Sequence, residues 1–333
     1  MLTSARYRQV PWPALRNAVE NVLRQHRPHT YWGQAFFDLT DSLIALRAAQ
    51  RELRIGVSLH AYVLFCLARA AADHPGVLTY RRGAQLLTFE DADVATLIDR
   101  RGEDGVRIPI VYTFRAAQDK SLAAINWELR QVLRGERSDL EAVRLRRRAA
   151  RLPGLLRRLV GWRMTRDPLL LRRYHGTIGL TSLHRPGLNR PFFALPPNIC
   201  TLTLAVGSLF DQLQLDAEGQ PRRRRYLCLT AGVDHAVVDG AEQAAFTQRL
   251  GELLEGASGL GEAFVDETRA LQREAQGLPR ETDASRQETL VSREDRSASQ
   301  QETGVSQQQT GPLRQETGVL HQETAASPRE TAA

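Results

Sequence analysis

Residues 226–243 read YLCLTAGVDHAVVDGAEQ, an apolar run that ends in a histidine followed by an Asp-Gly pair. The run at 225–235 predicts a buried strand, and AEQAAFTQRLGELLEG (241–256) predicts a helix that ends in glycine. His235 therefore stands at the end of a strand, four residues before Asp239. A histidine in this place is either a core residue with satisfied hydrogen bonds or a base that the strand end positions.

The rest of the chain mixes strand and helix signals. AEGQ (217–220) predicts a hairpin turn before the strand at 225–235, and Pro109 suggests that its own strand is a sheet edge or contains a bulge. The order lacks the regular alternation of a doubly wound fold, so we expect a mixed α/β (α+β) domain. The further expected elements are strands at 106–114 and 198–210 and helices at 41–54, 58–74 and 119–134, the last starting near Asp119.

The C-terminal segment is a repeat. From residue 278 the chain divides into eight heptapeptides such as SRQETLV and LHQETAA. A coiled coil needs two apolar positions in each heptad, whereas these have at best one, with Gly, Pro and Ser around it. We expect a tail over 259–333 in which the heptapeptide repeats at 278–333 are disordered, and an N-terminal helical extension over 1–27.

The composition excludes several classes of protein. No apolar run is long enough for a transmembrane helix, and the N-terminus lacks the pattern of a secretory signal. The three cysteines (Cys66, Cys200 and Cys228) each lie in an apolar run, which is typical of a reduced, cytoplasmic protein. Neither they nor the histidines have metal-ligand spacing, so we expect no metal site.

The positive charge is concentrated in one segment. Residues 144–173 hold eleven arginines and one acid, and LRRRAARLPGLLRRLVGWRMTRDPLLLRRYHG (145–176) also carries leucines and a tryptophan. The rest of the body is nearly neutral, so a nucleic-acid-binding face is not indicated. Three accounts of this segment stay open. In the first, the segment binds an anionic membrane surface and the protein is membrane-peripheral. In the second, it binds an acidic carrier protein or the phosphates of coenzyme A. In the third, its leucines pack on the domain and its arginines form a solvated face.

Six stretches occur in one order along residues 28–256. They are PHTYWGQAFFDLT (28–40), SLHAYVLFCLARAAADHPGVLTYRRG (58–83), IPIVYTFRAAQDKSLAAINWEL (108–129), GTIGLTSL (176–183), PPNICTLTLAVGSL (196–209) and DHAVVDGAEQAAFTQRLGELLE (234–255). With these stretches and the H-x-x-x-D-G motif, the sequence resembles the catalytic domain of the 2-oxoacid dehydrogenase acyltransferases (E2 components) and the related chloramphenicol acetyltransferase. The resemblance implies a catalytic domain over 28–258, with the basic insert at 138–175.

The resemblance also implies an assembly and a site. The fold would be a mixed sheet covered by helices, assembled as homotrimers that can build larger cages, with the active site between subunits. His235 would come from one subunit, while Thr181 and the segment around Lys120 would come from the next. Thr181, or its neighbour Ser182, would donate to the oxyanion, and Asp239 would fix the loop that holds the imidazole. Lys120, Ser121 and Gly240 would lie where coenzyme A binds.

The chemistry of acyl transfer fits these residue types. The attacking thiol, amine or hydroxyl must lose a proton, and an imidazole with a near-neutral pKa suits that task. A hydroxyl donor can stabilise the tetrahedral oxyanion. Each residue also has a structural reading: His235 as a core residue, Thr181 as an ordinary strand hydroxyl, and Lys120, the one lysine in the chain, as a surface residue at a helix start.

Three differences from the E2 pattern limit the expected function. No lipoyl domain or covalent lipoyl site precedes the match, which suggests a stand-alone form. Ala236 follows His235 where E2 enzymes have arginine, and the basic segment is enlarged. We expect an acyltransferase that uses acyl-coenzyme A, and the alternative is a non-catalytic trimeric scaffold that keeps the fold. The resemblance identifies neither the acyl group nor its acceptor.

Overall fold

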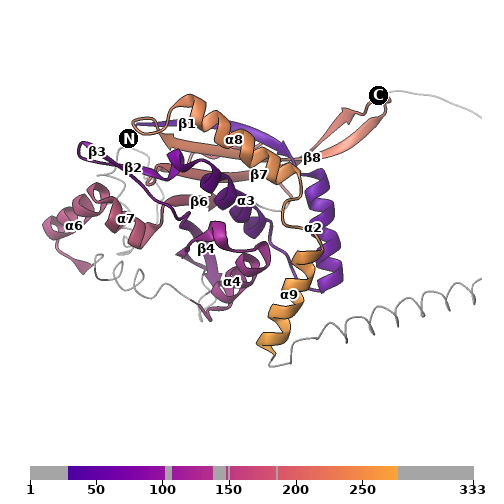
Figure 1. Cartoon of the computed structure of the whole chain (residues 1–333), viewed down its shortest axis with the longest axis horizontal. Helices are drawn as coiled ribbons and strands as arrows, with labels where there is room; N and C mark the ends of the chain where they lie inside the picture. The colour runs from indigo at the N-terminus through magenta and orange to yellow at the C-terminus, as the bar shows by residue number, and fades with distance from the viewer. Residues whose placement is uncertain (1–28, 102–106, 138–147, 149–150, 185–186, 277–333) are drawn as a thin grey trace, which may run out of the picture. The chain divides into compact units, whose positions relative to one another are not determined.

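The computed structural model describes residues 29–101, 107–137, 148, 151–184 and 187–276 (Figure 1). The expected N-terminal helical extension (1–27) and the heptapeptide repeats (278–333) lie outside the described residues, as does part of the basic insert.

A mixed six-stranded sheet is the central layer, with the strand order β1-β8-β7-β6-β4-β5. β6 pairs in parallel with both β4 and β7, and the other neighbours are antiparallel. This sheet confirms the predicted fold class. Its strands are β1 (Thr30–Asp38), β4 (Val94–Arg101), β5 (Arg107–Phe114), β6 (Ile178–Ser182), β7 (Leu202–Leu215) and β8 (Pro221–Asp234), and a separate hairpin pairs β2 (Thr79–Arg82) with β3 (Gln85–Thr88).

Two strand predictions are confirmed with changes in length. β5 is an edge strand that pairs with β4 alone, as Pro109 suggested, because an edge tolerates the missing N–H of proline. β7 and β8 form the expected hairpin around AEGQ, but both strands continue towards the turn beyond the expected ends. The added residues are exposed or partly exposed and pair across the hairpin, where the Asp211 carboxylate contacts Arg223 and Arg225.

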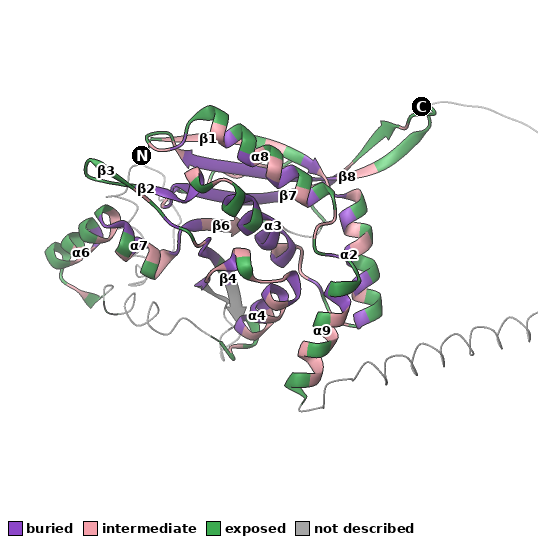
Figure 2. Cartoon of the chain, in the orientation of Figure 1, coloured by how far each residue is buried: buried purple, intermediate pink, exposed green. Residues whose placement is uncertain are grey.

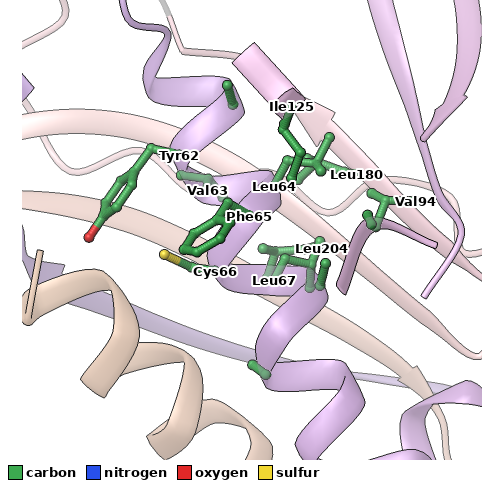
Figure 3. Packing of buried hydrophobic residues seen from close by; sticks show 14 of the residues in the cluster. Tyr62, Val63, Leu64, Phe65, Cys66, Leu67, Val94, Ile125, Leu180 and Leu204 are labelled. Atoms are coloured by element: carbon green, nitrogen blue, oxygen red, sulfur yellow. The ribbon is translucent and has the colours of Figure 1, made fainter. Parts of the chain in front are cut away.

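Helices cover one face of the sheet and share one hydrophobic core with it (Figure 1). The core helix is α3 (Leu59–Asp73), from which Tyr62 to Leu67 are all buried (Figure 2). Figure 3 shows Leu64 and Leu67 directed toward Ile125 and the sheet residues Val94, Leu180 and Leu204, while Tyr62 and Cys66 point to the other side of the helix. The other helices of this core are α2 (Thr40–Leu53), α4 (Leu122–Arg134), α8 (Gly240–Glu255) and α9 (Glu262–Ala275).

The start and end of α3 follow from local chemistry. The Ser58 hydroxyl accepts a hydrogen bond from the His60 N–H, so Ser58 caps the helix as its sequence position predicted. Pro75 comes two residues after the helix ends and begins a short 3₁₀ turn, η1 (Pro75–Leu78). Within the described residues, no helix combines the length and apolar character needed to cross a bilayer.

Two element boundaries differ from the prediction. α4 begins at Leu122 and is capped by Ser121, while Asp119 ends a separate 3₁₀ turn, η2 (Ala117–Asp119). Residues from 259 were expected to form a tail, but α9 buries Phe264 and Val265 in the main core. α9 therefore belongs to the compact body of the described chain. The spacing of these apolar residues on a charged helix was the signal that the prediction missed.

The described part of the basic insert forms two helices, α6 (Gly154–Arg166) and α7 (Pro168–His175). α7 buries Leu171 in a small cluster with Tyr80 and Phe89. By contrast, Gly161 is the one buried residue of α6, and the side chains of Leu155 and its neighbours are exposed (Figure 2). The account in which the leucines of the insert pack on the domain therefore holds for Leu171 and is wrong for α6.

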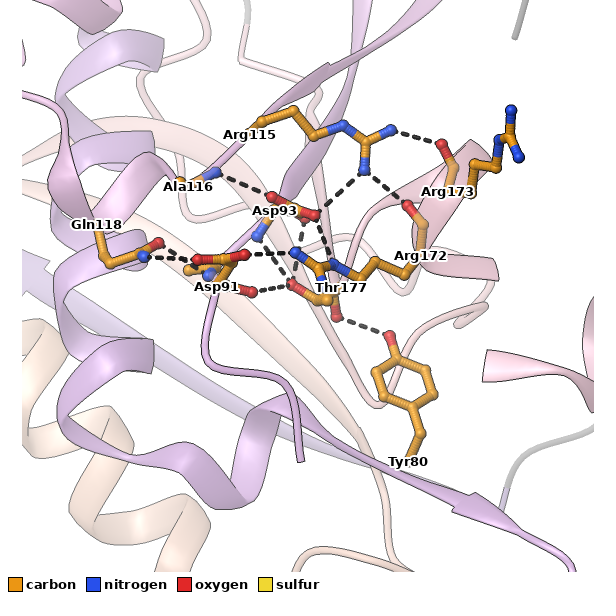
Figure 4. Close-up of polar contacts among 10 residues, drawn as sticks. Tyr80, Asp91, Asp93, Arg115, Ala116, Gln118, Arg172, Arg173 and Thr177 are labelled. Atoms are coloured by element: carbon orange, nitrogen blue, oxygen red, sulfur yellow. Dashed lines mark hydrogen bonds and ion pairs between the residues drawn. The ribbon is translucent and has the colours of Figure 1, made fainter. Parts of the chain in front are cut away.

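A buried carboxylate joins α7 to the sheet. The Asp93 side chain, 2% exposed, accepts hydrogen bonds from Arg115 (3.2 Å), from Nε of Arg172 (3.0 Å) and from the Ala116 N–H (2.9 Å) (Figure 4). Arg115 also donates to the Arg172 carbonyl (2.7 Å) and to the Arg173 carbonyl (2.5 Å). One carboxylate thus connects the start of β4, the end of β5 and the last turn of α7.

The backbone beside Asp93 is equally restricted. The Thr177 N–H donates to the Asp93 carbonyl at 2.7 Å, and the Thr177 hydroxyl accepts from the Asp93 N–H at 2.9 Å. Gly176 has φ +73°, and a Cβ there would clash with the Asp93 carbonyl oxygen. The chain therefore needs glycine to pass from α7 into β6 at this point. We call the contacts of Asp93 with Arg115, Arg172 and Thr177 the Asp93 brace.

We expect Asp93→Asn to lower the free energy of unfolding by about 3 kcal/mol, because it leaves two partly buried arginines without their shared counter-charge. Asp91→Asn is the matched control. Its carboxylate also contacts Arg172 but is 38% exposed, so the loss should stay below about 1 kcal/mol. Urea unfolding followed by circular dichroism measures both losses. Equal losses, or an unaffected Asp93→Asn protein, would contradict the brace.

Candidate functional site

The loop after β8 holds His235 by backbone hydrogen bonds. The His235 N–H donates to the His29 carbonyl at 2.9 Å, which ties the loop to the chain just before β1. The Asp234 carbonyl accepts from the N–H groups of Val237 and Val238 at 3.0 Å each, and its carboxylate accepts from the Ala236 N–H at 3.1 Å. These contacts form a tight turn that fixes the backbone on both sides of the histidine.

The imidazole of His235 is held in one tautomer. Its Nδ1 lies 3.1 Å from the Val238 carbonyl oxygen. A carbonyl oxygen can only accept, so Nδ1 carries the hydrogen and the neutral ring has its lone pair on Nε2. His235 is exposed, and the described residues give Nε2 no hydrogen-bond partner. A general base requires an imidazole nitrogen that carries no hydrogen and has no hydrogen-bond partner within the protein, and Nε2 of His235 meets this requirement among the described residues.

Tyr31 packs against this imidazole. The two ring centroids are 4.8 Å apart with an interplanar angle of 59°. The Tyr31 hydroxyl is buried, and the described residues offer it no hydrogen-bond partner. Burial, and then the nearby Asp239 carboxylate, raise the pKa of Tyr31. Sequence reasoning missed this residue, because the contact depends on the pairing of Tyr31 with Val233 across β1 and β8.

Asp239 and Gly240 stand at the start of α8, directly after the His235 loop. Asp239 is the N-cap residue of α8, but its exposed carboxylate accepts no hydrogen bond from the described chain. Asp234, and not Asp239, supplies the carboxylate that fixes the loop. Gly240 does not adopt a left-handed conformation, and a Cβ there would meet the Tyr31 hydroxyl at an ordinary 3.9 Å. Within a single chain, neither the backbone conformation nor a close contact therefore requires glycine at position 240.

Thr181 and Ser182 lie at the end of β6, far from His235 in the same chain. Thr181 pairs with Ala205 of β7, which pairs with Thr230 of β8, five residues before His235. From the rise per residue and the strand spacing, Thr181 and His235 are roughly 20 Å apart. Thr181 also alternates with the core residue Leu180 and so faces away from the helices. One chain therefore does not bring base and hydroxyl together.

Lys120 and Ser121 are engaged within the chain. The Lys120 ammonium lies 2.6 Å from the carboxylate of Glu128, whose side chain is 7% exposed. The Tyr112 hydroxyl donates to the same carboxylate at 2.6 Å. Ser121 caps α4 and donates to Glu267 of α9 at 2.5 Å. The structure thus gives Lys120 the task of compensating a buried charge, and its binding of an anionic coenzyme stays a prediction.

A cavity of about 640 Å³ opens beside α7 and contains several arginines. Arg115 and Arg172 in its wall are bonded to Asp93, and Arg137 lies 3.6 Å from Glu128. These carboxylates neutralise much of the positive charge of the cavity wall. The arginines there serve mainly to pair with buried acids, so we do not assign the cavity as an anion-binding site. In the part of the chain that the structure describes, no three His, Cys, Asp or Glu side chains gather as metal ligands.

Comparisons of sequence give no relative for this chain. No protein-family model matches it. No curated protein matches it in sequence either.

Solved structures share its fold. A probable dihydrolipoamide acetyltransferase from Listeria monocytogenes is 16% identical, with a TM-score of 0.54 over 76% of this chain and 96% of that chain. The cubic core of the pyruvate dehydrogenase multienzyme complex is 18% identical, with a TM-score of 0.55 over 76% and 93%. A truncated catalytic core of the 2-oxoacid dehydrogenase multienzyme complex from Thermoplasma acidophilum is 16% identical, with a TM-score of 0.52 over 75% and 99%.

At these identities the likeness establishes the fold. Nearly the whole length of each of those catalytic cores is matched, so the described body corresponds to one complete catalytic-core fold. The mixed sheet with helices on one face is thus the chloramphenicol acetyltransferase-like fold that the sequence predicted, in the form that the E2 acetyltransferase cores have.

Proposed function

We propose that this protein is an acyltransferase that moves an acyl group between acyl-coenzyme A and a thiol, amine or hydroxyl acceptor, with His235 as the general base. The observation that carries the proposal is the hydrogen bond from Nδ1 of the exposed His235 to the Val238 carbonyl, which leaves the lone pair of the neutral ring on Nε2. The fold shared with acetyltransferase cores supports the reaction class. A histidine kept only for packing would be buried, whereas this one is exposed.

In the proposed reaction Nε2 of His235 removes the proton from the acceptor as the acceptor attacks the thioester carbonyl. The carbonyl π electrons move to oxygen and give a tetrahedral oxyanion. Collapse of this intermediate breaks the carbon–sulfur bond, and the leaving thiolate takes the proton from the imidazolium. The acyl group is transferred, His235 returns to its neutral form, and no oxidant or metal is consumed.

In the proposed reaction Thr181 acts as the oxyanion donor from a second copy of the chain. Thr181, with Ser182 beside it, stays the candidate donor, but it lies roughly 20 Å from His235 in the same chain. We therefore propose a homotrimer in which each site is shared by two subunits. Exposed leucines on the strand face away from the helices, Leu97 at 50% and Leu183 beside the end of β6 at 45%, support a contact between copies there.

The structure supports the expected coenzyme A contacts of Lys120, Ser121 and Gly240 less well than it supports His235 as a base. Lys120 would bind a phosphate only by sharing or leaving Glu128, and Ser121 already caps α4. Gly240 alone lies beside the His235 loop. The proposed reaction therefore depends on the His235 loop and not on a particular set of coenzyme contacts.

A non-catalytic scaffold is the second candidate function. The observation in its favour is the Asp239 carboxylate, which accepts no hydrogen bond from the described residues although the family motif keeps it. A scaffold would need neither the Nδ1 contact of His235 nor a hydroxyl at position 181. Activity measurements separate the two candidates directly.

We expect His235→Ala to lower the rate of thiol release from acyl-coenzyme A by about 10²–10⁴-fold, because the base is lost. A colorimetric assay of free thiol over a panel of acyl groups and acceptors measures this. The matched control is His29→Ala, which removes an exposed imidazole near the loop but keeps the carbonyl that holds His235. If no acyl-coenzyme A in the panel is turned over, or if His235→Ala keeps the wild-type rate, His235 is not a catalytic base and the non-catalytic scaffold is favoured.

A mixing experiment tests the shared site. Thr181→Val keeps the shape of the side chain, removes the hydroxyl and should lower the rate by about 10²–10³-fold. Co-refolding equal amounts of His235→Ala and Thr181→Val chains should restore activity, because about a quarter of the interfaces in a random cyclic assembly then join an intact His235 to an intact Thr181. Mixtures as inactive as their components would show that the site is not shared in this way.

A further inference from the structure

Helix α6 presents a row of apolar side chains to solvent. Leu155, Leu159 and Trp162 follow one another at helical spacing, and Leu156 lies beside them. Their exposed fractions are 81% for Leu155, 51% for Leu156, 59% for Leu159 and 43% for Trp162. Buried Gly161 marks the opposite side of the helix, which faces the protein. We call the solvent side, with these four residues, the α6 face.

Arginines stand between the apolar residues of the α6 face. At 100° per residue, Arg166 projects between Leu155 and Leu159, and Arg163 projects close to Leu156. Arg163 is 61% exposed, and the Arg166 guanidinium lies 4.9 Å from the centroid of the Trp162 ring. Apolar and cationic groups therefore share one convex surface instead of occupying opposite sides of the helix.

Acidic residues do little to neutralise this surface. Asp167 is the one acid among residues 151–175. Its carboxylate accepts from the Leu169 N–H at 3.1 Å as the cap of α7 and lies 3.3 Å from Arg163. The Asp93 brace then fixes α7 on the body, so α6 is held in place by its partner helix while its outer side stays exposed.

We propose that the α6 face binds the surface of an anionic lipid bilayer. The helix would lie in the plane of the membrane, with the leucines and Trp162 at the boundary between headgroups and acyl chains. Arg163 and Arg166 would reach the lipid phosphates, their aliphatic stems covering apolar surface. A tryptophan at this depth is favourable because its ring is apolar and its N–H is polar.

A bilayer fits these observations better than an acidic protein does. An acidic protein partner would pair with the arginines but would need its own apolar groove to take up four large exposed side chains. An anionic bilayer supplies phosphates and hydrocarbon at adjacent depths along the whole helix. The attachment is interfacial, because the α6 face mixes cationic and apolar side chains on one side of the helix. The inference goes beyond acyl transfer and does not depend on it.

The test is flotation of the full chain with vesicles of phosphatidylcholine, alone or mixed with phosphatidylglycerol. Wild type should bind the mixed vesicles, and Leu155→Gln/Leu159→Gln should weaken binding by about tenfold or more. Arg163→Gln/Arg166→Gln should also weaken it by about tenfold or more and reduce its sensitivity to salt. The matched control is Leu213→Gln/Leu215→Gln, two leucines of β7 that are 70% and 73% exposed and should not affect binding.

Two further measurements keep the result interpretable. Vesicles should shift the tryptophan emission to the blue, and Trp162→Phe should remove most of that shift. Sedimentation velocity should give the leucine variant the size of wild type. Failure of wild type to bind the mixed vesicles overturns the proposal, as does binding that survives the leucine changes. A smaller assembly in the leucine variant also overturns it, because the α6 face would then be a contact between copies.

Discussion

The burial of α3 is the constraint on which the rest of the described fold depends. From Ala61 to Ala71 only Arg69 is exposed, so the helix is apolar around nearly its whole circumference. Such a helix must be covered on every side. The sheet supplies one side and the other core helices supply the rest. Because β6 is parallel to its neighbour β4, the chain between them must cross over, and this crossover contains β5, α4 and the basic insert. The crossover can therefore be enlarged without changing the core.

Buried carboxylates explain why several cations are not available as ligand sites. Asp93 and Glu128 are almost completely buried, and a buried charge is costly unless it is paired. Arg115 and Arg172 are drawn to the first, and Lys120 to the second. The cations that a motif comparison would assign to a coenzyme thus stabilise the body instead. Arg163 of the α6 face lies 3.3 Å from the buried Asp167 carboxylate but stays 61% exposed, and Arg166 lies over the ring of Trp162. These two arginines are therefore still open to a partner on the outside of the helix.

Local signals predicted much of this fold, and contacts between distant strands account for what was missed. The helix that starts at residue 58 and the AEGQ turn each depend on a few neighbouring residues, and both were predicted from the sequence. β4 was not expected, because its pairing with β6 spans the whole crossover. The same holds for the brace, where residues 93, 115 and 172 meet, and for Tyr31, which reaches His235 through the register of β1 with β8. His235 itself was predicted from a motif that is contiguous in the sequence.

The two halves of the proposed reaction differ in what assembles them. Everything that prepares His235 as a base is local to one chain: the His29 carbonyl, the Asp234 turn, the Val238 carbonyl and the Tyr31 ring. The hydroxyl that would stabilise the oxyanion is on another strand and faces away from the helices. On the proposed mechanism, folding alone therefore yields a chain with a prepared base and no oxyanion donor. Association of copies then completes the site, which ties acyl transfer to the oligomeric state.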